Sequence, residues 1–153
     1  MFNRLIGRRS LTLISLLMGS MFIAIAHAQM PVSAAPADAR VYFIEPKNGQ
    51  VFSFQEEKGI EIKFGLSGME VSPAGMAVPN SGHHHLMINM DQLPDLNLPL
   101  PATDQVRHFG KGQTSTKIDL PPGKHRLQLL LANHVHIPHS PAVMSEVIEI
   151  EVK

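Results

Sequence analysis

Short stretches of alternating apolar and polar residues run through most of the chain. The stretch "GIEIKFGL", residues 59–66, has an apolar side chain at every second position and charged residues or glycine between them. A period of two is typical of a strand with one face in a core. Turn-forming sequences such as "KNG" and "PPG" separate comparable stretches. These lie at 40–46, 51–54, 85–90, 114–120, 124–133 and 143–153.

This pattern determines the predicted fold class. No stretch carries a convincing apolar stripe of period 3.6. About seven short strands separated by turns favour an all-β domain, and specifically an immunoglobulin-like antiparallel β-sandwich. We expect a single sandwich domain over residues 40–153. The preceding residues 29–39, "QMPVSAAPADA", are small, contain proline and lack hydrophobic periodicity, which predicts a flexible leader.

The N-terminus has the pattern of a cleavable secretory signal peptide over residues 1–28. Three arginines precede an uncharged apolar stretch at 11–25, and Ala26-His27-Ala28 has the small residues of a cleavage site. That stretch is shorter than the ~20 residues a membrane span needs, so no stable anchor is expected after cleavage. We expect a periplasmic or secreted protein. The Arg8-Arg9 pair leaves open whether export uses general secretion or the twin-arginine route.

Charge and cysteine content narrow the classes of function. Three of the thirteen basic residues precede Gln29, whereas all thirteen acidic residues follow it, which leaves the exported chain a formal charge of −3. A nucleic-acid partner would require a basic face, so none is expected. The chain has no cysteine. No disulfide framework is therefore available, and hydrophobic burial must stabilise the domain.

Three consecutive histidines, in "SGHHHLMIN" (residues 81–89), are the first chemical signal in the sequence. Side chains alternate across a strand, so His84 shares a face with the apolar Leu86 and should point into the core. His83 and His85 share the opposite face with Met87. Alternate positions lie ~7 Å apart, which lets two imidazoles converge on one metal ion while other ligands come from a loop.

A second group of histidines is expected at the same end of the sandwich. If successive strands reverse direction, "HVHIPHSP" brings His134, His136 and His139 to the end that holds the triple. The same reversal places His108 at that end too. His125, beside the "PPG" turn, falls at the other end. The predicted metal ligands are His83, His85, His134 and His136. Supplementary candidates are His84, His108, His139 and Met87.

The residue types indicate which ion the site would take. Neutral imidazole suits zinc, copper(II), nickel and iron, while a methionine sulfur would favour copper(I). We therefore expect copper or zinc. Glu146 shares the inward parity of the last strand and could orient a ligand histidine through its second ring nitrogen. The alternative for Glu146 is a solvated position before the strand enters the core.

Other functions remain open at this stage. The domain could be a metal-free structural or recognition module whose histidines stabilise the long loops at 67–82 and 91–104 and whose partner is an envelope protein. The cluster could also act as a protonation switch, because charged imidazoles repel one another. A metalloenzyme would need an open coordination position and a general base, and no motif specifies a substrate. No catalytic residue is assigned.

Four ordered motifs carry a resemblance to a known family. "GHHHLMIN", "HFGKGQT", "LPPGKHRLQLLL" and "HVHIPHSPAVMSE" resemble the motifs of domain-of-unknown-function family 4399, a family of bacterial exported domains. The resemblance spans residues 40–153. It implies a single small exported β domain behind a signal peptide, and it implies no activity. The histidines considered above belong to these motifs, so the resemblance is compatible with a site without supplying one.

Overall fold

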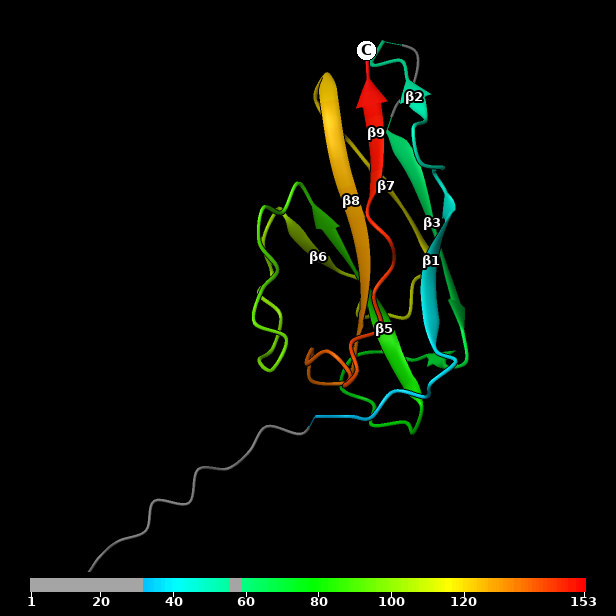
Figure 1. The fold of residues 1–153 in the computed structure, drawn as a ribbon, viewed down its shortest axis with the longest axis vertical. Helices are drawn as coiled ribbons and strands as arrows, with labels where there is room; N and C mark the ends of the chain where they lie inside the picture. The colour runs from blue at the N-terminus through cyan, green and yellow to red at the C-terminus, as the bar shows by residue number, and fades with distance from the viewer. Residues whose placement is uncertain (1–31, 56–58) are drawn as a thin grey trace, which may run out of the picture.

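A computed structural model of the protein describes residues 32–55 and 59–153, and within them it contains nine strands and no helix. The predicted signal peptide lies outside the described residues. The chain folds as two β-sheets packed face to face (Figure 1). The predicted all-β sandwich is confirmed, and the two strands beyond the seven expected are the short β4 (Glu70–Val71) and β6 (Val106–His108).

The smaller sheet has three antiparallel strands in the order β1-β3-β7. Their bounds are β1 Arg40–Glu45, β3 Ile60–Ser67 and β7 Ser115–Ile118. The larger sheet has the order β2-β9-β8-β5-β4, with β6 also paired to β5. Its bounds are β2 Val51–Phe52, β4 Glu70–Val71, β5 Ser81–Ile88, β6 Val106–His108, β8 Gly123–Ala132 and β9 Ile148–Val152. The pairs β2–β9 and β4–β5 are parallel, and the other pairs are antiparallel.

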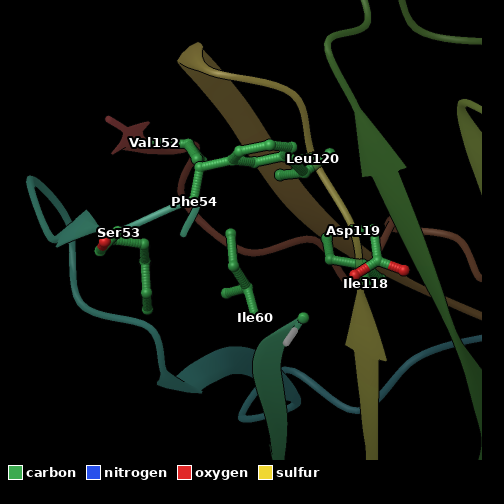
Figure 2. Close-up of a pocket in the computed structure, with 9 residues that line it drawn as sticks. Ser53, Phe54, Ile60, Ile118, Asp119, Leu120 and Val152 are labelled. Atoms are coloured by element: carbon green, nitrogen blue, oxygen red, sulfur yellow. The ribbon is translucent and has the colours of Figure 1, made fainter. Parts of the chain in front are cut away.

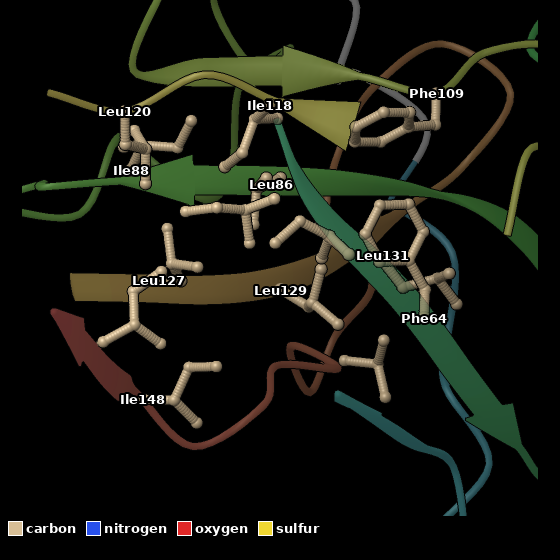
Figure 3. Close-up of a cluster of buried hydrophobic side chains, with 14 of the residues drawn as sticks. Phe64, Leu86, Ile88, Phe109, Ile118, Leu120, Leu127, Leu129, Leu131 and Ile148 are labelled. Carbon is tan, nitrogen blue, oxygen red and sulfur yellow. The ribbon is translucent and has the colours of Figure 1, made fainter. Parts of the chain in front are cut away.

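The main hydrophobic core lies between the sheets and follows the alternation of the sequence. Leu127, Leu129 and Leu131 of β8 are fully buried. They pack with the same cluster that holds Ile62 and Phe64 of β3 (Figure 3). Alternate side chains of a strand point to one face, so the polar residues between the apolar ones of β3 point outward. This core supplies the rigid platform that positions β5.

A second, smaller core covers the outer face of β5 and β8. Met87, Val106, Leu130 and Ala132 are buried there together with Leu100 from the long loop after β5. All eight residues of β5 are buried, with Leu86 and Ile88 in the main core and Met87 in this outer cluster. The loops that follow β5 and β8 supply part of this outer cluster and so help to cover that face of the sheet.

The residues before β1 lie against the loop that follows β8. Ala35 donates a backbone hydrogen bond to Ser140, and Ser140 donates one to Ser33. Ala39 is buried in the main core. Residues 32–39 of the predicted leader are thus held against the loop after β8. Nothing helical in the described part of the chain has the length and apolarity to cross a bilayer.

Candidate metal centre

Strand alternation divides the three consecutive histidines between the two faces of β5. The His84 ring points into the main core and packs against Phe64, with ring centroids 5.1 Å apart. The His83 and His85 rings lie together on the other face, with centroids 4.5 Å apart. All three side chains are buried, with 0% exposure. The face predicted for each of the three is the face observed.

His136 brings a third imidazole to this pair. Its Nδ1 lies 3.0 Å from Nε2 of His83 and 3.5 Å from Nε2 of His85. One ring nitrogen from each of the three residues lies within 4.8 Å of the other two. His83, His85 and His136 thus form a group that could hold a metal ion.

A tight turn after β8 aims the His136 ring at β5. Asn133 organises this turn: its Oδ1 accepts hydrogen bonds from the N–H groups of Val135 and Ile137, at 3.0 and 3.1 Å. The N–H of His136 also donates to the Asn133 backbone carbonyl at 2.9 Å. His136 itself has a positive φ of 66°, a left-handed conformation that is uncommon outside glycine, although histidine adopts it more often than most residues. The surrounding hydrogen bonds hold it there.

His108 reaches the group from the neighbouring strand. It lies directly opposite His85 in the β5–β6 register, and the two ring centroids are 4.3 Å apart. Nδ1 of His108 lies 3.1 Å from Nδ1 of His136, and its Nε2 lies 3.0 Å from the carbonyl oxygen of Pro101. His108 and His136 are half-buried, whereas His83 and His85 are fully enclosed. The first two therefore form the outer wall of the cluster and the last two its floor.

Burial keeps the rings of His83, His85 and His136 uncharged at neutral pH. Desolvation, with the neighbouring His136 and His108 acting in the same direction, lowers the pKa of His83 from 6.5 to about 4. Burial lowers the pKa of His85 to about 2, and His83 adds to this. Burial also lowers the pKa of His136, followed by the effect of His108. A neutral imidazole has the free lone pair that a metal requires, so the environment favours the ligating form.

Several buried ring nitrogens lack a hydrogen-bond partner within the described residues. They are Nδ1 of His83, Nδ1 of His85, and both ring nitrogens of His84 and of His139. Backbone groups of Gln113 and Gly65 lie near enough to offset part of the effect of burial on the His84 pKa, which falls to about 4. Metal-binding histidines usually donate the second ring N–H to a carboxylate or carbonyl. His83 and His85 lack that support here.

The remaining sequence candidates lie around the group without joining it. His134 is absent from the three-residue group, and its backbone carbonyl accepts a hydrogen bond from Gly75. Met87 packs in the outer hydrophobic cluster. His139 is buried next to Gly82, and burial lowers its pKa. His125 bonds Asn89 and the Pro121 carbonyl at the far end of β8, as expected.

Of the two positions that the sequence allows for Glu146, the structure shows the solvated one. It is exposed and lines a surface pocket together with Tyr42 and Pro46. Ile148, which shares its parity in the chain, is buried. Val143 and Ser145 before it are also buried, whereas Glu146 and Val147 are both exposed, so the alternation is interrupted here and the parity of β9 does not extend back to Glu146.

A separate pocket of about 440 Å³ opens at the opposite end of the sandwich. Figure 2 shows Phe54 beside Leu120 and Val152, with Ile60 below them and Asp119 at one side. Its lining residues include no histidine. Val152 pairs with Gly123 at one end of β8, whereas His83 pairs with Ala132 at the other. The histidine cluster and this apolar pocket are therefore independent features.

Fold and site together define a small β-sandwich domain with a cluster of histidines at one end, of which His83 and His85 are fully buried. The chain belongs to the family described as domain of unknown function (DUF4399), whose model matches residues 62–153. That span contains every histidine of the cluster. The resemblance seen in the sequence motifs is confirmed.

Comparison with other proteins adds little beyond the family. No curated protein matches the chain. Among solved structures, the endo-beta-1,4-mannanase from Thermotoga petrophila matches with 16% identity and a TM-score of 0.44. The match covers 76% of this chain and 20% of the mannanase. A similarity this low says nothing about the activity of the present protein.

Proposed function

We propose that the protein is an exported metal-binding module that takes up one copper or zinc ion through His83, His85 and His136. The observation that carries the proposal is the convergence of three imidazoles on Nδ1 of His136, at 3.0, 3.1 and 3.5 Å. In a neutral ring, Nδ1 has either one proton or one lone pair, so it forms one good hydrogen bond and not three. A cation among these nitrogens would satisfy several lone pairs at once.

The spacing of the nitrogens supports the same proposal. With Zn–N bonds of about 2.0 to 2.1 Å, tetrahedral geometry places ligand nitrogens roughly 3.3 Å apart. The distances from His136 Nδ1 to the nitrogens of His83 and His85, 3.0 and 3.5 Å, bracket this value. The rings would need only small shifts to bind an ion. In the empty protein a single N–H at His136 Nδ1 can serve only one of these contacts well, so the nitrogens are not all satisfied at once.

The donor set restricts the class of ion. Imidazole nitrogens suit zinc, copper(II), nickel and iron, whereas magnesium and calcium require oxygen ligands. Met87, the candidate that would have favoured copper(I), packs in the outer hydrophobic cluster. Our proposal therefore centres on a divalent ion of intermediate softness, with zinc and copper(II) as the two to test.

A carrier or buffer fits the site better than permanent structural binding. Outer hydrogen bonds to ligand histidines typically raise metal affinity by 10- to 100-fold each. Nδ1 of His83 and of His85 lacks such a bond among the described residues. The half-buried His136 offers the ion a route to the surface. Both features favour an ion that exchanges.

Export is part of the proposal, and its support is the signal-peptide pattern of residues 1–28. In the periplasm or outside the cell, a domain without cysteine holds a metal without competing thiol oxidation. An envelope protein that delivers or receives the ion would be the natural partner. Detection of the mature chain in a periplasmic extract would test this component separately.

Isothermal titration of the metal-free protein with zinc and with copper(II) tests the proposal. We expect one ion per chain and a rise in melting temperature, since an ion at 100 times its dissociation constant adds about 2.7 kcal/mol of stability. The double variant His83→Ala/His85→Ala should lose this binding. A folded wild-type protein that binds neither ion would overturn the proposal.

The matched controls are histidines outside the group. His125→Ala removes an imidazole at the opposite end of β8 and should leave the affinity unchanged. His134→Ala tests the fourth residue expected from the sequence. If His125→Ala weakened binding as much as the double variant, the titration would be reporting nonspecific surface histidines.

A metal-free role in stabilising loops is the second candidate. Two contacts favour it: His108 Nε2 lies 3.0 Å from the Pro101 carbonyl oxygen, and the Leu100 N–H donates to the His136 carbonyl. These tie the loop after β5 to the histidine cluster. Under this alternative, His108→Ala would destabilise the protein while the wild type shows no stoichiometric metal binding.

A further inference from the structure

We infer that His108 is a fourth ligand of this centre and binds the ion through Nδ1, so that the occupied site is a closed cage of four imidazoles. The inference rests on the proposed function and specifies its coordination. It distinguishes a binding site from a catalytic one, because catalytic metal sites keep a position open for water or substrate.

Distance is the first argument for His108. Its Nδ1 lies 3.1 Å from Nδ1 of His136, close to the roughly 3.3 Å spacing of neighbouring ligands around a tetrahedral zinc ion. The ring also stands edge-on to that of His85, with an angle of 72° between their planes. His108 is not a member of the mutually close group of three, so its ring must move inward when the ion binds.

The backbone carbonyl of Pro101 determines which nitrogen of His108 can bind. A carbonyl oxygen only accepts hydrogen bonds, so His108 Nε2, 3.0 Å away, must carry a proton. In the neutral ring, the lone pair therefore belongs to Nδ1, the atom that faces His136. This is the arrangement in which the second ring N–H of a metal ligand donates to a backbone carbonyl. Within the cluster, His108 is thus the histidine already supported as a ligand.

The loop after β5 is tied to both outer histidines. Leu100, 4% exposed, donates its N–H to the His136 carbonyl at 2.9 Å, and the adjacent Pro101 accepts from His108. His108 also stands at the end of β6, which is three residues long and pairs only with β5 among the described strands. A short strand and a loop can move together, which gives His108 the freedom to complete the cage.

Long-range ¹H–¹⁵N NMR spectra of the histidine rings, recorded with and without zinc, test this on the wild-type protein. We expect zinc to shift Nε2 of His83 and His85 and Nδ1 of His136 and His108. The His108 ring should keep its proton on Nε2 in both states. If zinc shifts three rings and leaves His108 unchanged, the inference fails while the proposed function stands. If the folded protein binds no zinc, both fail.

A variant gives an independent readout. His108→Ala should lower zinc affinity at least about tenfold, the minimum expected when even an outer support of a ligand is lost. With cobalt(II) as the probe, the wild type should show the strong visible absorption of four-coordinate cobalt. The variant should show the weaker bands of a site that has gained water. Equal affinity and equal spectra would overturn the inference.

His125→Ala is the matched control, because His125 also bonds a proline carbonyl through Nε2, at 2.7 Å to Pro121. Its Nδ1 faces Asn89 instead of histidines. This variant should lose a comparable backbone contact without changing the cobalt spectrum. If His108→Ala proves too unstable to titrate, the wild-type NMR experiment decides the question alone.

Discussion

The backbone carbonyl of Asn133 accepts a hydrogen bond from the N–H of His136 at 2.9 Å, and this turn directs the His136 ring toward β5. The Asn133 side chain closes the same turn by accepting from Val135 and Ile137. Asn133 is 2% exposed. A buried amide that touches no ion thus determines where one of the candidate ligands lies.

Replacing Asn133 should weaken metal binding without removing a ligand. Asn133→Ala leaves two backbone N–H groups without their acceptor, at a cost of about 1 to 3 kcal/mol in stability. We expect zinc affinity to fall at least about tenfold by titration, because His136 loses its orientation. Asn89→Ala is the control: Asn89 accepts from the Arg126 N–H at the other end of β8. Equal zinc affinities for the two variants would contradict this role.

Stability of the metal-free protein should fall on acidification. Burial lowers the pKa of His83 and of His84 to about 4 in the folded state, from 6.5 in the unfolded chain. Between these values the unfolded chain binds more protons, so the free energy of unfolding decreases as the pH falls from 6.5 to about 4. His85, at about 2, extends the loss further. Urea denaturation at a series of pH values measures this, and a flat profile would refute it.

The core-facing His84 should be dispensable for metal binding. His84→Leu replaces a buried ring, both of whose nitrogens lack a partner in the described chain, with an apolar side chain of similar size. We expect stability at neutral pH to stay level or rise by about 1 kcal/mol, and its dependence on acid to lessen. Zinc affinity should not change, whereas His85→Leu should abolish binding. Loss of binding in His84→Leu would place the site on the wrong face of β5.

Gly82, which precedes the three histidines, has no room for a side chain. A methyl group there would lie 2.6 Å from the backbone oxygen of Ala132 and 3.0 Å from Nε2 of His139. Gly82→Ala should therefore destabilise the protein by about 1 to 3 kcal/mol in thermal or urea unfolding. Gly110→Ala, whose new methyl would meet only the Ala74 side chain at 3.2 Å, should cost less. A Gly82→Ala protein as stable as the wild type would show that β5 and β8 can separate here.

Strand periodicity accounts for the parts of the site that could be predicted. The alternation through β5 assigned His84 to the core and His83 and His85 to the other face, because side-chain direction in a strand depends only on parity. The same rule predicted the inward residues of β9, Ile148 among them. It could not decide between the two positions considered for Glu146, because that residue precedes β9, where the alternation is interrupted.

The pairing His134-x-His136 shows where the rule does not apply. Both residues are predicted ligands, but the chain there forms a turn held by Asn133, with φ of 66° at His136. In a turn, alternate residues need not share a direction. Only His136 joins the group of three. Asn133 itself could have been suspected, because asparagine side chains often bond the backbone two residues on.

The amino-acid sequence alone determined the all-β class, the family, the two faces of β5 and the gathering of most histidines at one end, because these depend on local periodicity, motifs and the reversal of successive strands. Tertiary structure alone decided that His108 stands opposite His85 and that His136 Nδ1 sits among three other imidazoles. Strand register and loop conformation are set by packing between residues distant in the chain. Local patterns contain no record of those contacts.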